Sequence, residues 1–549
     1  MKCRKRILPL MLAGVMAMSC LTGCGGSTSG STEETPADAA TSETSATEPV
    51  QATYPLRDEP VTLTIYMKDP SNGAVGDWSE MKGMKTAAEK LGVNIEFITP
   101  AVGSEADQFN LMIASGEYPD VILWDYRTTP MSLNEMVNTG VLIDADPYIR
   151  QYAPNYLKVL EEHENFNKEA LSDDGHYLAM YAFSDVSIVS GGPAIRKDLL
   201  DKYGLEVPTT VDDWTEVFAA MKEKDPNVEY PLTDGKGRDG SVWFCMPMTA
   251  YKTSNIFCLD DETGKVVYGP STDNFKAYLA KLNEWYNAGY IDPEFMSNDG
   301  TSMNAKLADG RSVAGTNLQL SYHIGNITTT ARETNPDFEF VGCPWPVLNE
   351  GEEPSYYMPN GIAYSGKQAA ITSACQDPAL AVQVLDFFYS EEGEDLLTWG
   401  IEGESYQVNE DGTKSFTDAI MNNPDGKNPQ EAIIEYATPQ YNFANVMMEE
   451  PYVEIITTLP EQREARNTWL DAVDGVNLPY LTVAPEVQSD YTMLMNDITT
   501  YVQEMYIQFI TGQANLESDW EAYLSTLNGM GLETVTQYMA DAYALYQQR

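Results

Sequence analysis

Two carboxylates near residue 400 form a pair whose spacing could support chemistry on a carbohydrate. Glu402 and Glu404 stand among glycines and aromatic residues in the segment WGIEGESY, residues 399–406. Glycoside hydrolases use two carboxyl groups that flank the scissile bond. Clefts that only hold a sugar draw on the same residue types, because carboxylates accept hydrogen bonds from hydroxyl groups and aromatic rings pack on apolar faces. The residue types alone therefore allow either cleavage or binding.

The spacing of Glu402 and Glu404 alone does not exclude a glycosidase, but the side from which they would approach a sugar argues against cleavage. In an extended segment both side chains project from one face, with Cα atoms about 6.6 Å apart. Both would then approach a sugar from the same side, whereas hydrolysis needs one carboxyl group on each side of the bond. In a helix the two side chains would diverge by about 200°. We therefore interpret the segment as a structural turn, in which Glu402 anchors backbone amides and Tyr406 contacts a ligand.

The composition excludes several partners and cofactors. The chain has 549 residues, with 33 Lys and Arg against 83 Asp and Glu, which gives a net charge of −50. So acidic a surface repels phosphate backbones, and no nucleic-acid partner is expected. The 3 histidines are scattered and no cysteines have CxxC spacing, so we expect neither a metal site nor a cofactor. Cys245 and Cys258 could pair in an exported protein, and buried free thiols are the alternative.

The N-terminus predicts export and lipid attachment. A basic stretch is followed by the apolar run ILPLMLAGVMAMSCL and then by LTGC, residues 21–24. This is the layout of a secretory signal peptide. The LTGC ending resembles a bacterial lipoprotein lipobox, which implies removal of residues 1–23 and attachment of lipid, such as palmitate, to Cys24. An ordinary signal peptide is the alternative.

The segment after the signal peptide predicts a tether. Residues 24–57 are dominated by Ser, Thr, Ala, Glu and Pro and cannot form a core. A coil of this length has a reach of roughly 30 Å. No later stretch approaches the roughly 20 apolar residues of a membrane span. We expect a protein held on the outer face of the cytoplasmic membrane by its lipid.

Strands and helices alternate in the region that follows. The segment VTLTIYM, residues 61–67, alternates β-branched and aromatic residues and predicts a strand. Helical and strand patterns then alternate through PDVILWD, residues 119–125, which indicates βαβ units and a parallel sheet. Ligands of open α/β sheets gather at the carboxyl ends of the strands. This rule points to residues 67–78, to residues 124–127 and to the loop after RSVAGTN.

Six stretches, in this order, resemble the type II extracellular solute-binding proteins of ABC importers. They are most similar to the long lipoproteins that handle carbohydrates in Gram-positive bacteria. The stretches are LMIASGEYPDVILW (111–124), AIRKDLLDKYGLEVPTTVDDWTEVFAAMKEKDPN (194–227), YNAGYIDPEF (286–295), AAITSACQDPALAVQVLDFFYSEEGEDLLTWGIEGESY (369–406), FITG (509–512) and DWEAYLSTLNGMGLETV (519–535). Their spread over nearly all of the mature chain makes the match specific at family level.

The resemblance implies an α/β fold with two lobes, the periplasmic-binding-protein-like fold of type II. Hinge segments would cross between the lobes near residues 182–192 and 356–364, and the C-terminal region would be helical. Lobe 1 would hold residues 58–183 and 360–430, and lobe 2 residues 184–345 and 431–549. Many of these relatives carry a calcium loop of the kind DPNGDGKKDEIP. Here the corresponding text is DPNVEYPLTDGKGRDG, which lacks the acidic core, so no calcium site is expected.

Aromatic faces and hydrogen-bonding side chains at strand ends are the expected ligand contacts. Core packing explains each tryptophan about as well as a place in the cleft, and a turn or cap explains the polar residues. Trp214, Trp285 and Trp520 are expected in helix cores. The predicted ligand-binding residues are Trp78, Trp124, Asp125, Trp243, Asn317, Trp345, Tyr357 and Tyr406.

We therefore expect a lipid-anchored binding protein, a monomer without catalytic residues. It would capture an oligosaccharide between its lobes and present the closed form to the permease subunits of an ABC transporter. A cell-surface glycoside hydrolase or lyase and a peptide-binding lipoprotein are the alternatives.

Overall fold

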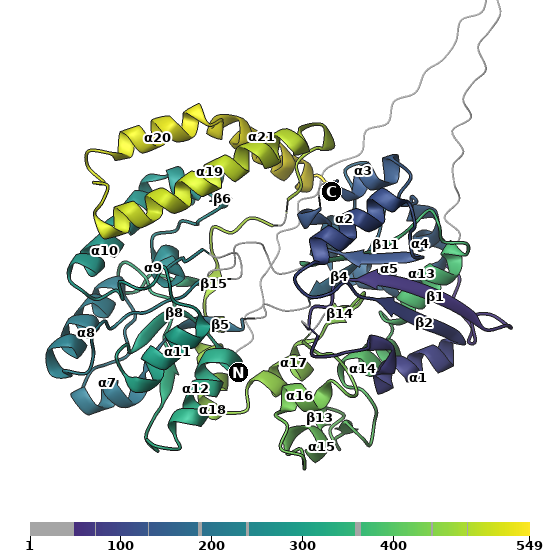
Figure 1. Ribbon diagram of the computed structural model, residues 1–549, viewed down its shortest axis with the longest axis horizontal. Helices are drawn as coiled ribbons and strands as arrows, with labels where there is room; N and C mark the ends of the chain where they lie inside the picture. The colour runs from purple at the N-terminus through teal and green to yellow at the C-terminus, as the bar shows by residue number, and fades with distance from the viewer. Residues whose placement is uncertain are drawn as a thin grey trace, which may run out of the picture. The chain divides into compact units, whose positions relative to one another are not determined.

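The computed structural model describes residues 49–549 except for 72, 130, 185–188, 238–240, 357–363, 441–442 and 480 (Figure 1). The N-terminal residues, with Cys24 and most of the predicted tether, lie outside the described residues. None of the helices in the described part of the chain has the length and hydrophobicity needed to cross a membrane.

A six-stranded sheet organises the first lobe, in the order β14-β4-β11-β3-β1-β2. Strand β1 pairs in parallel with β2 and with β3, while β11 runs antiparallel to β3 and to β4. The parallel βαβ units predicted from the sequence are therefore present. The strands are β1 Val61–Met67, β2 Val93–Ile98, β3 Val121–Trp124, β4 Met180–Ser184, β11 Tyr364–Ile371 and β14 Val446–Met447.

Successive side chains of β1 point to opposite faces of the sheet, so alternate residues of this strand are buried on one face. Leu63 and Ile65 are 2% and 0% exposed and belong to the core beneath the sheet. Helix α1 is capped at its C-terminus by Gly92, whose φ of 68° is the left-handed conformation that glycine adopts freely. The helices around this sheet are α1 Lys82–Leu91, α2 Glu105–Ser115, α3 Leu133–Asn138, α4 Asp146–Tyr152, α5 Pro154–Glu162, α6 Glu164–Ala170, α13 Pro378–Phe387 and α14 Glu391–Thr398.

A smaller antiparallel sheet, in the order β8-β5-β9, organises the second lobe. Helix α18 packs so closely on it that a Cβ at Gly192 would lie 2.5 Å from the ring of Trp469. The elements of this lobe are β5 Gly191–Arg196, β8 Ala314–Gln319, β9 Phe340–Gly342, α7 Lys197–Tyr203, α8 Val211–Lys224, α9 Cys245–Ala250, α10 Asp273–Asn287, α11 Gly300–Asp309, α12 Asn326–Ala331 and α18 Pro460–Leu470.

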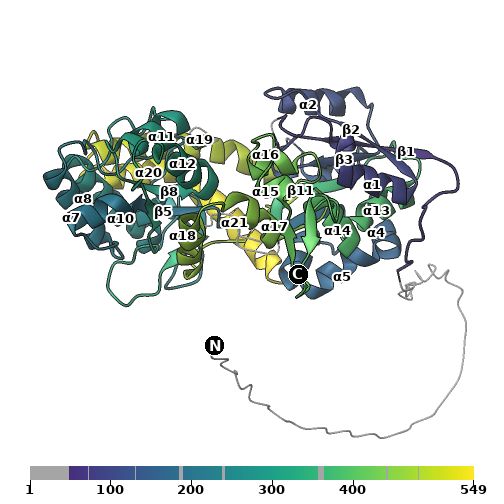
Figure 2. The same cartoon turned by 90° about the horizontal axis from the view of Figure 1, so that it is seen from below.

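Helices make up most of the C-terminal region, as predicted. Helix α19 packs along α10 of the second lobe (Figures 1 and 2). Trp214, Trp285 and Trp520 are 0%, 0% and 2% exposed in the core that these helices share, which confirms the prediction for all three. The C-terminal helices are α19 Pro485–Thr511, α20 Trp520–Gly529 and α21 Leu532–Tyr546.

Short elements connect the larger ones. They are β6 Phe257–Leu259, β7 Val266–Tyr268, β10 Ser355–Tyr356, β12 Tyr406–Val408, β13 Lys414–Phe416, β15 Val473–Asp474, α15 Asp418–Met421, α16 Pro429–Ile433, α17 Glu449–Ile456, the 3₁₀ turns η1 Trp78–Glu80, η2 Tyr126–Thr128 and η3 Gly269–Ser271, and the π-helical turn η4 Leu320–Gly325.

Strand pairing adds detail to the predicted lobe boundaries. Because β14 pairs with β4, the first sheet draws on chain beyond residue 430. The predicted hinge crossings fall largely on 185–188 and 357–363, which lie outside the described residues, so the boundaries stay predictions. The four cysteines of the described chain are free thiols, so Cys245 and Cys258 do not pair in this structure.

Candidate ligand-binding site

The carboxyl ends of β1 and β3 bring charged side chains to one edge of the first sheet. The two strands are parallel neighbours, so Asp69 after β1 and Asp125 after β3 lie at the same edge. Strand β11 runs the other way and pairs Gln368 with Trp124, which places Lys367 beside them. Desolvation lowers the pKa of Lys367 to about 8, and the charges of Asp125 and Asp69 oppose that shift.

Asp69 shapes the loop that leaves β1. Its Oδ1 accepts hydrogen bonds from the backbone N–H of Ser71 at 2.9 Å and from the Nε1 of Trp78 at 3.3 Å, and its Oδ2 accepts the N–H of Gly73 at 2.7 Å. These bonds commit the Asp69 carboxylate to the loop. The Asp125 carboxylate lies at the same edge and can accept a hydrogen bond from a ligand hydroxyl. Asp125 keeps partial exposure.

A second polar group lies within β8 of the second lobe. Because β8 continues to Gln319, the prediction that Asn317 stands at the tip of its strand is wrong. The hydroxyl of Thr316 donates to the carboxylate of Asp234 and accepts the backbone N–H of Cys245 at 3.2 Å. Burial raises the pKa of Asp234 to about 6, although the Thr316 hydrogen bond works against that shift. Asn317, the next residue of β8, is exposed. Its amide can both donate to and accept from a hydroxyl group.

Trp243 adds an aromatic ring to this part of the second lobe. It precedes α9, keeps partial exposure, and packs on Tyr506 with the ring centroids 4.4 Å apart. Asp125, Trp243 and Asn317 are thus the predicted residues that retain solvent exposure here. Tyr357 lies outside the described residues.

The other predicted aromatic residues are covered by protein. Trp78 and Trp345 are 0% and 2% exposed, and Tyr406 is buried against Trp399. Trp124 packs against the rings of Phe109 and Tyr66, with centroids 4.7 Å and 5.6 Å away. Trp124 ends β3 and Trp78 follows the loop after β1, as predicted, but all four side chains turn inward to the core. A ligand role for these four residues stays a prediction.

A cavity of about 380 Å³ lies beside this edge. Its volume is within the range of small-molecule sites. Tyr126, Tyr181 and Gln368 line it from the first lobe, and further lining residues come from 481–495 and the end of the chain. Apart from Tyr181, a weaker candidate from the sequence, these residues were not predicted, because no sequence motif links segments that are hundreds of residues apart. Two features of the sequence could have pointed to this cavity, the helical segment of α3 and the hydrophobic run at 478–483.

The segment that corresponds to the calcium loop of the relatives begins at Asp225, and the Asp225 carboxylate is already bonded to groups of the protein. Asp225 accepts hydrogen bonds from the Tyr203 hydroxyl at 2.9 Å and the Asn227 backbone at 3.0 Å, and Lys202 lies 3.6 Å away. These donors hold the pKa of Asp225 below its ordinary value, although burial works to raise it. In the described part of the chain no group of three or more His, Cys, Asp and Glu side chains could hold a metal ion.

A family model described as bacterial extracellular solute-binding protein matches residues 76–395, more than half of the chain. The chain belongs to the bacterial extracellular solute-binding protein family. Members of this family bind solutes, so membership confirms the prediction that the protein is not an enzyme. The resemblance noted in the sequence is confirmed as well.

Two curated relatives are similar to this solute-binding protein over most of their length. The fructooligosaccharide ABC transporter substrate-binding protein FusA of Streptococcus pneumoniae serotype 4 (strain ATCC BAA-334 / TIGR4) is 23% identical over 523 residues, which cover 90% of this chain and 92% of FusA. Lipoprotein LipO of Bacillus subtilis (strain 168) is 24% identical over 453 residues, covering 78% and 82% of the two chains.

Solved structures show the fold of this solute-binding protein. The alginate-binding protein AlgQ2, solved without calcium ion, matches with a TM-score of 0.69 and 21% identity over 89% of this chain and 99% of AlgQ2. The HMO-binding, ABC-transporter-associated solute-binding protein of Bifidobacterium longum infantis ATCC 15697 matches with a TM-score of 0.69 and 18% identity over 89% and 99% of the two chains. The two-lobe fold of type II predicted from the sequence is confirmed.

Proposed function

We propose that this solute-binding protein captures an oligosaccharide between its two lobes and delivers it to the permease of an ABC importer. The observation that carries the proposal is the chemistry of three side chains that keep solvent exposure. A carboxylate at Asp125, an amide at Asn317 and an aromatic ring at Trp243 suit the hydroxyl groups and apolar faces of sugars. The names of the relatives support a carbohydrate ligand, because FusA is a fructooligosaccharide-binding protein.

The protein works as the lipid-anchored, extracellular partner of that permease. The lipobox-like LTGC sequence supports an anchor at Cys24, and LipO is itself named a lipoprotein. Ligand stabilises the closed arrangement of the lobes through contacts that the open arrangement lacks. The closed form then docks on the membrane subunits as a monomer.

A calorimetric titration of the purified protein tests the ligand class. The panel holds kestose, nystose, oligogalacturonides, alginate oligomers and a set of short peptides. We expect binding to at least one oligosaccharide and a stabilisation of about 2.7 kcal/mol at a ligand concentration 100 times the Kd. Binding of peptides alone, or turnover of a polysaccharide, would overturn the proposal.

Substitutions test whether the binding site is the one described. Asp125→Asn is expected to weaken binding about tenfold or more, because hydrogen bonds to charged groups are the stronger class. Asn317→Ala removes one neutral amide and is expected to cost less than this. Glu404→Gln is the matched control, since Glu404 is an exposed carboxylate paired with Lys82 at 2.9 Å. Equal affinity in all three variants would contradict the assignment.

Membrane fractionation tests the anchor. Cys24→Ser is expected to move the protein from the membrane pellet to the soluble fraction of cells. Cys375→Ser, at a free and half-buried cysteine, is the control and is expected to stay in the pellet. Retention of the Cys24→Ser variant in the pellet would refute lipid attachment at this residue.

A further inference from the structure

The aromatic ring of Trp243 rests on a residue of the C-terminal helices. Its centroid is 4.4 Å from that of Tyr506 on α19, and the two ring planes are inclined at 48°. Tyr506 is 2% exposed and lies in the core that α19 shares with α10. One side of the Trp243 ring is therefore covered by Tyr506, while the side chain as a whole keeps partial exposure.

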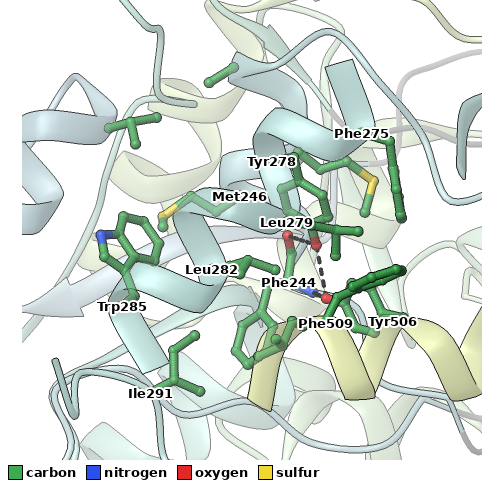
Figure 3. Packing of buried hydrophobic residues seen from close by; sticks show 14 of the residues in the cluster. Phe244, Met246, Phe275, Tyr278, Leu279, Leu282, Trp285, Ile291, Tyr506 and Phe509 are labelled. Atoms are coloured by element: carbon green, nitrogen blue, oxygen red, sulfur yellow. Dashed lines mark hydrogen bonds between the residues drawn. The ribbon is translucent and has the colours of Figure 1, made fainter. Parts of the chain in front are cut away.

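The hydroxyl of Tyr506 also fixes the backbone next to Trp243 (Figure 3). It accepts the N–H of Phe244 at 3.2 Å and lies 2.9 Å from the hydroxyl of Tyr278, which donates to the carbonyl of Phe244 at 3.1 Å. Because Tyr278 has one hydrogen and uses it on that carbonyl, Tyr506 donates in the bond between the tyrosines. The three hydrogen bonds close a ring that satisfies both polar groups of Phe244.

Cys245, the residue after Phe244, is held by hydrogen bonds to other groups. Cys245 donates its N–H to Thr316 on β8, and its thiol donates to the carbonyl of Trp243 at 3.3 Å. Thr316 precedes the exposed Asn317. The backbone from Trp243 to Cys245 is thereby tied both to α19 and to β8, the strand that carries Asn317.

Two buried tyrosine hydroxyls at this place need an explanation beyond packing. A buried hydrogen bond contributes little net stability, because it replaces bonds to water. Two phenylalanines would fill the same space but would leave the buried N–H and carbonyl of Phe244 without these partners. What the hydroxyls add is a fixed direction for the peptide group of Phe244, and hence for the ring of Trp243 that precedes it.

We propose that Tyr506 is a positioning residue for the ligand site and holds Trp243 as the aromatic platform for a sugar ring of the ligand. The inference rests on the proposed function. In this arrangement Tyr506 does not touch the ligand. It acts through Trp243, so the C-terminal helices contribute to affinity without reaching the sugar.

Four variants test this inference by titration with nystose, or with the panel oligosaccharide that the wild-type protein binds. Trp243→Ala and Tyr506→Leu are each expected to weaken binding about tenfold, near the upper limit for one aromatic pair. Tyr506→Phe keeps the ring and is expected to weaken binding by less. Tyr523→Phe is the matched control, because Tyr523 is a buried tyrosine of the same core whose hydroxyl donates to Pro270 at 3.0 Å.

The double variant Trp243→Ala/Tyr506→Leu separates positioning from general stability. If Tyr506 acts through Trp243, the double variant binds no more weakly than Trp243→Ala alone, which is a non-additive result. Tyr523→Phe should lower the Tm as Tyr506→Phe does and leave affinity unchanged. Additive losses in the double variant, or unchanged affinity in Tyr506→Leu while it is folded, overturn the inference. A wild-type protein that binds no oligosaccharide instead overturns the proposed function, and the inference falls with it.

Discussion

Replacing Lys306 by methionine should destabilise the second lobe more than any surface substitution. The ammonium of Lys306 donates to Asp292 at 2.7 Å, to Glu294 at 2.7 Å and to Asn298 at 2.9 Å. The side chains of Lys306 and Asp292 are 9% and 2% exposed. Methionine keeps most of the buried volume, so the substitution removes the charge and not the packing.

The cost follows from the charge that remains on Asp292. Its carboxylate keeps only neutral donors among these neighbours, the Thr233 hydroxyl at 2.9 Å and the Asn298 amide at 2.8 Å. Removing one partner of a buried ion pair costs about 3–5 kcal/mol. The loss of the contact with Glu294, whose side chain is 68% exposed, adds at most about 1 kcal/mol to this cost. We expect the free energy of unfolding to fall by about 3–5 kcal/mol at neutral pH.

The pH dependence has a definite sign. Burial works to raise the pKa of Asp292, but the hydrogen bonds from Lys306 and Asn298 outweigh it and hold the pKa below its ordinary value. In the wild type this stabilisation is present at neutral pH and is lost as the pH falls through the lowered pKa. In Lys306→Met burial dominates and raises the pKa of Asp292. The deficit of the variant should therefore shrink on acidification, as the carboxylate takes up a proton.

Urea unfolding followed by circular dichroism measures these differences. Lys281→Met is the control, because Lys281 pairs at 3.0 Å with Glu284, whose side chain is 55% exposed, and should cost about 1 kcal/mol or less. The double variant Lys306→Met/Asp292→Asn should regain most of the loss. The reasoning fails if Lys306→Met costs no more than Lys281→Met, or if its deficit grows as the pH is lowered.

Three further predictions concern stability. Burial lowers the pKa of His323 to about 4, so the Tm should fall between about pH 6.5 and 4, and His323→Gln should flatten that fall. Burial raises the pKa of Asp234 to about 6. As the pH is lowered from about 6 to 4, the wild type should therefore gain stability relative to Asp234→Asn, which is opposite to the effect of His323. Gly192→Ala places a Cβ 2.5 Å from the Trp469 ring and should cost about 1–3 kcal/mol in denaturant unfolding, whereas Gly529→Ala meets no atom within 4 Å and should not destabilise.

Much of the fold could be predicted because its signals are local. Alternation over residues 61–67 predicted the strand β1 with the bounds observed, Val61–Met67. The threonine that caps α8 and the helical spacing around it placed Trp214 in the core, where it is 0% exposed. Such features depend on neighbours a few residues away, which a sequence displays directly.

The site was only partly predictable, because it depends on where side chains point. That Trp124 ends a strand was correct, but a strand end fixes the edge of the sheet and not the direction of the ring. Its direction is set by Phe109, on the helix before β3, and by Tyr66 on β1. Tyr506 was not predicted at all, since it meets Phe244 from 262 residues further along the chain.

The turn at residues 399–406 shows how the same residue types can serve structure alone. The hydroxyl of Ser405 accepts the N–H of Ile401 at 2.8 Å and donates to the carbonyl of Trp399 at 2.7 Å, and so makes the backbone contacts expected from Glu402. Glu402 and Glu404 are exposed, and Glu404 pairs with Lys82 on α1.

This arrangement gives a physical reason why two neighbouring carboxylates do not make a hydrolytic pair here. A general acid needs a pKa raised by burial, and its partner must face it across a sugar. An exposed carboxylate in an ion pair has neither the dry surroundings nor a partner on the opposite side. The turn instead joins α14 to β12, and Glu404 forms a surface ion pair with Lys82 at the start of α1, a contact of about 1 kcal/mol or less.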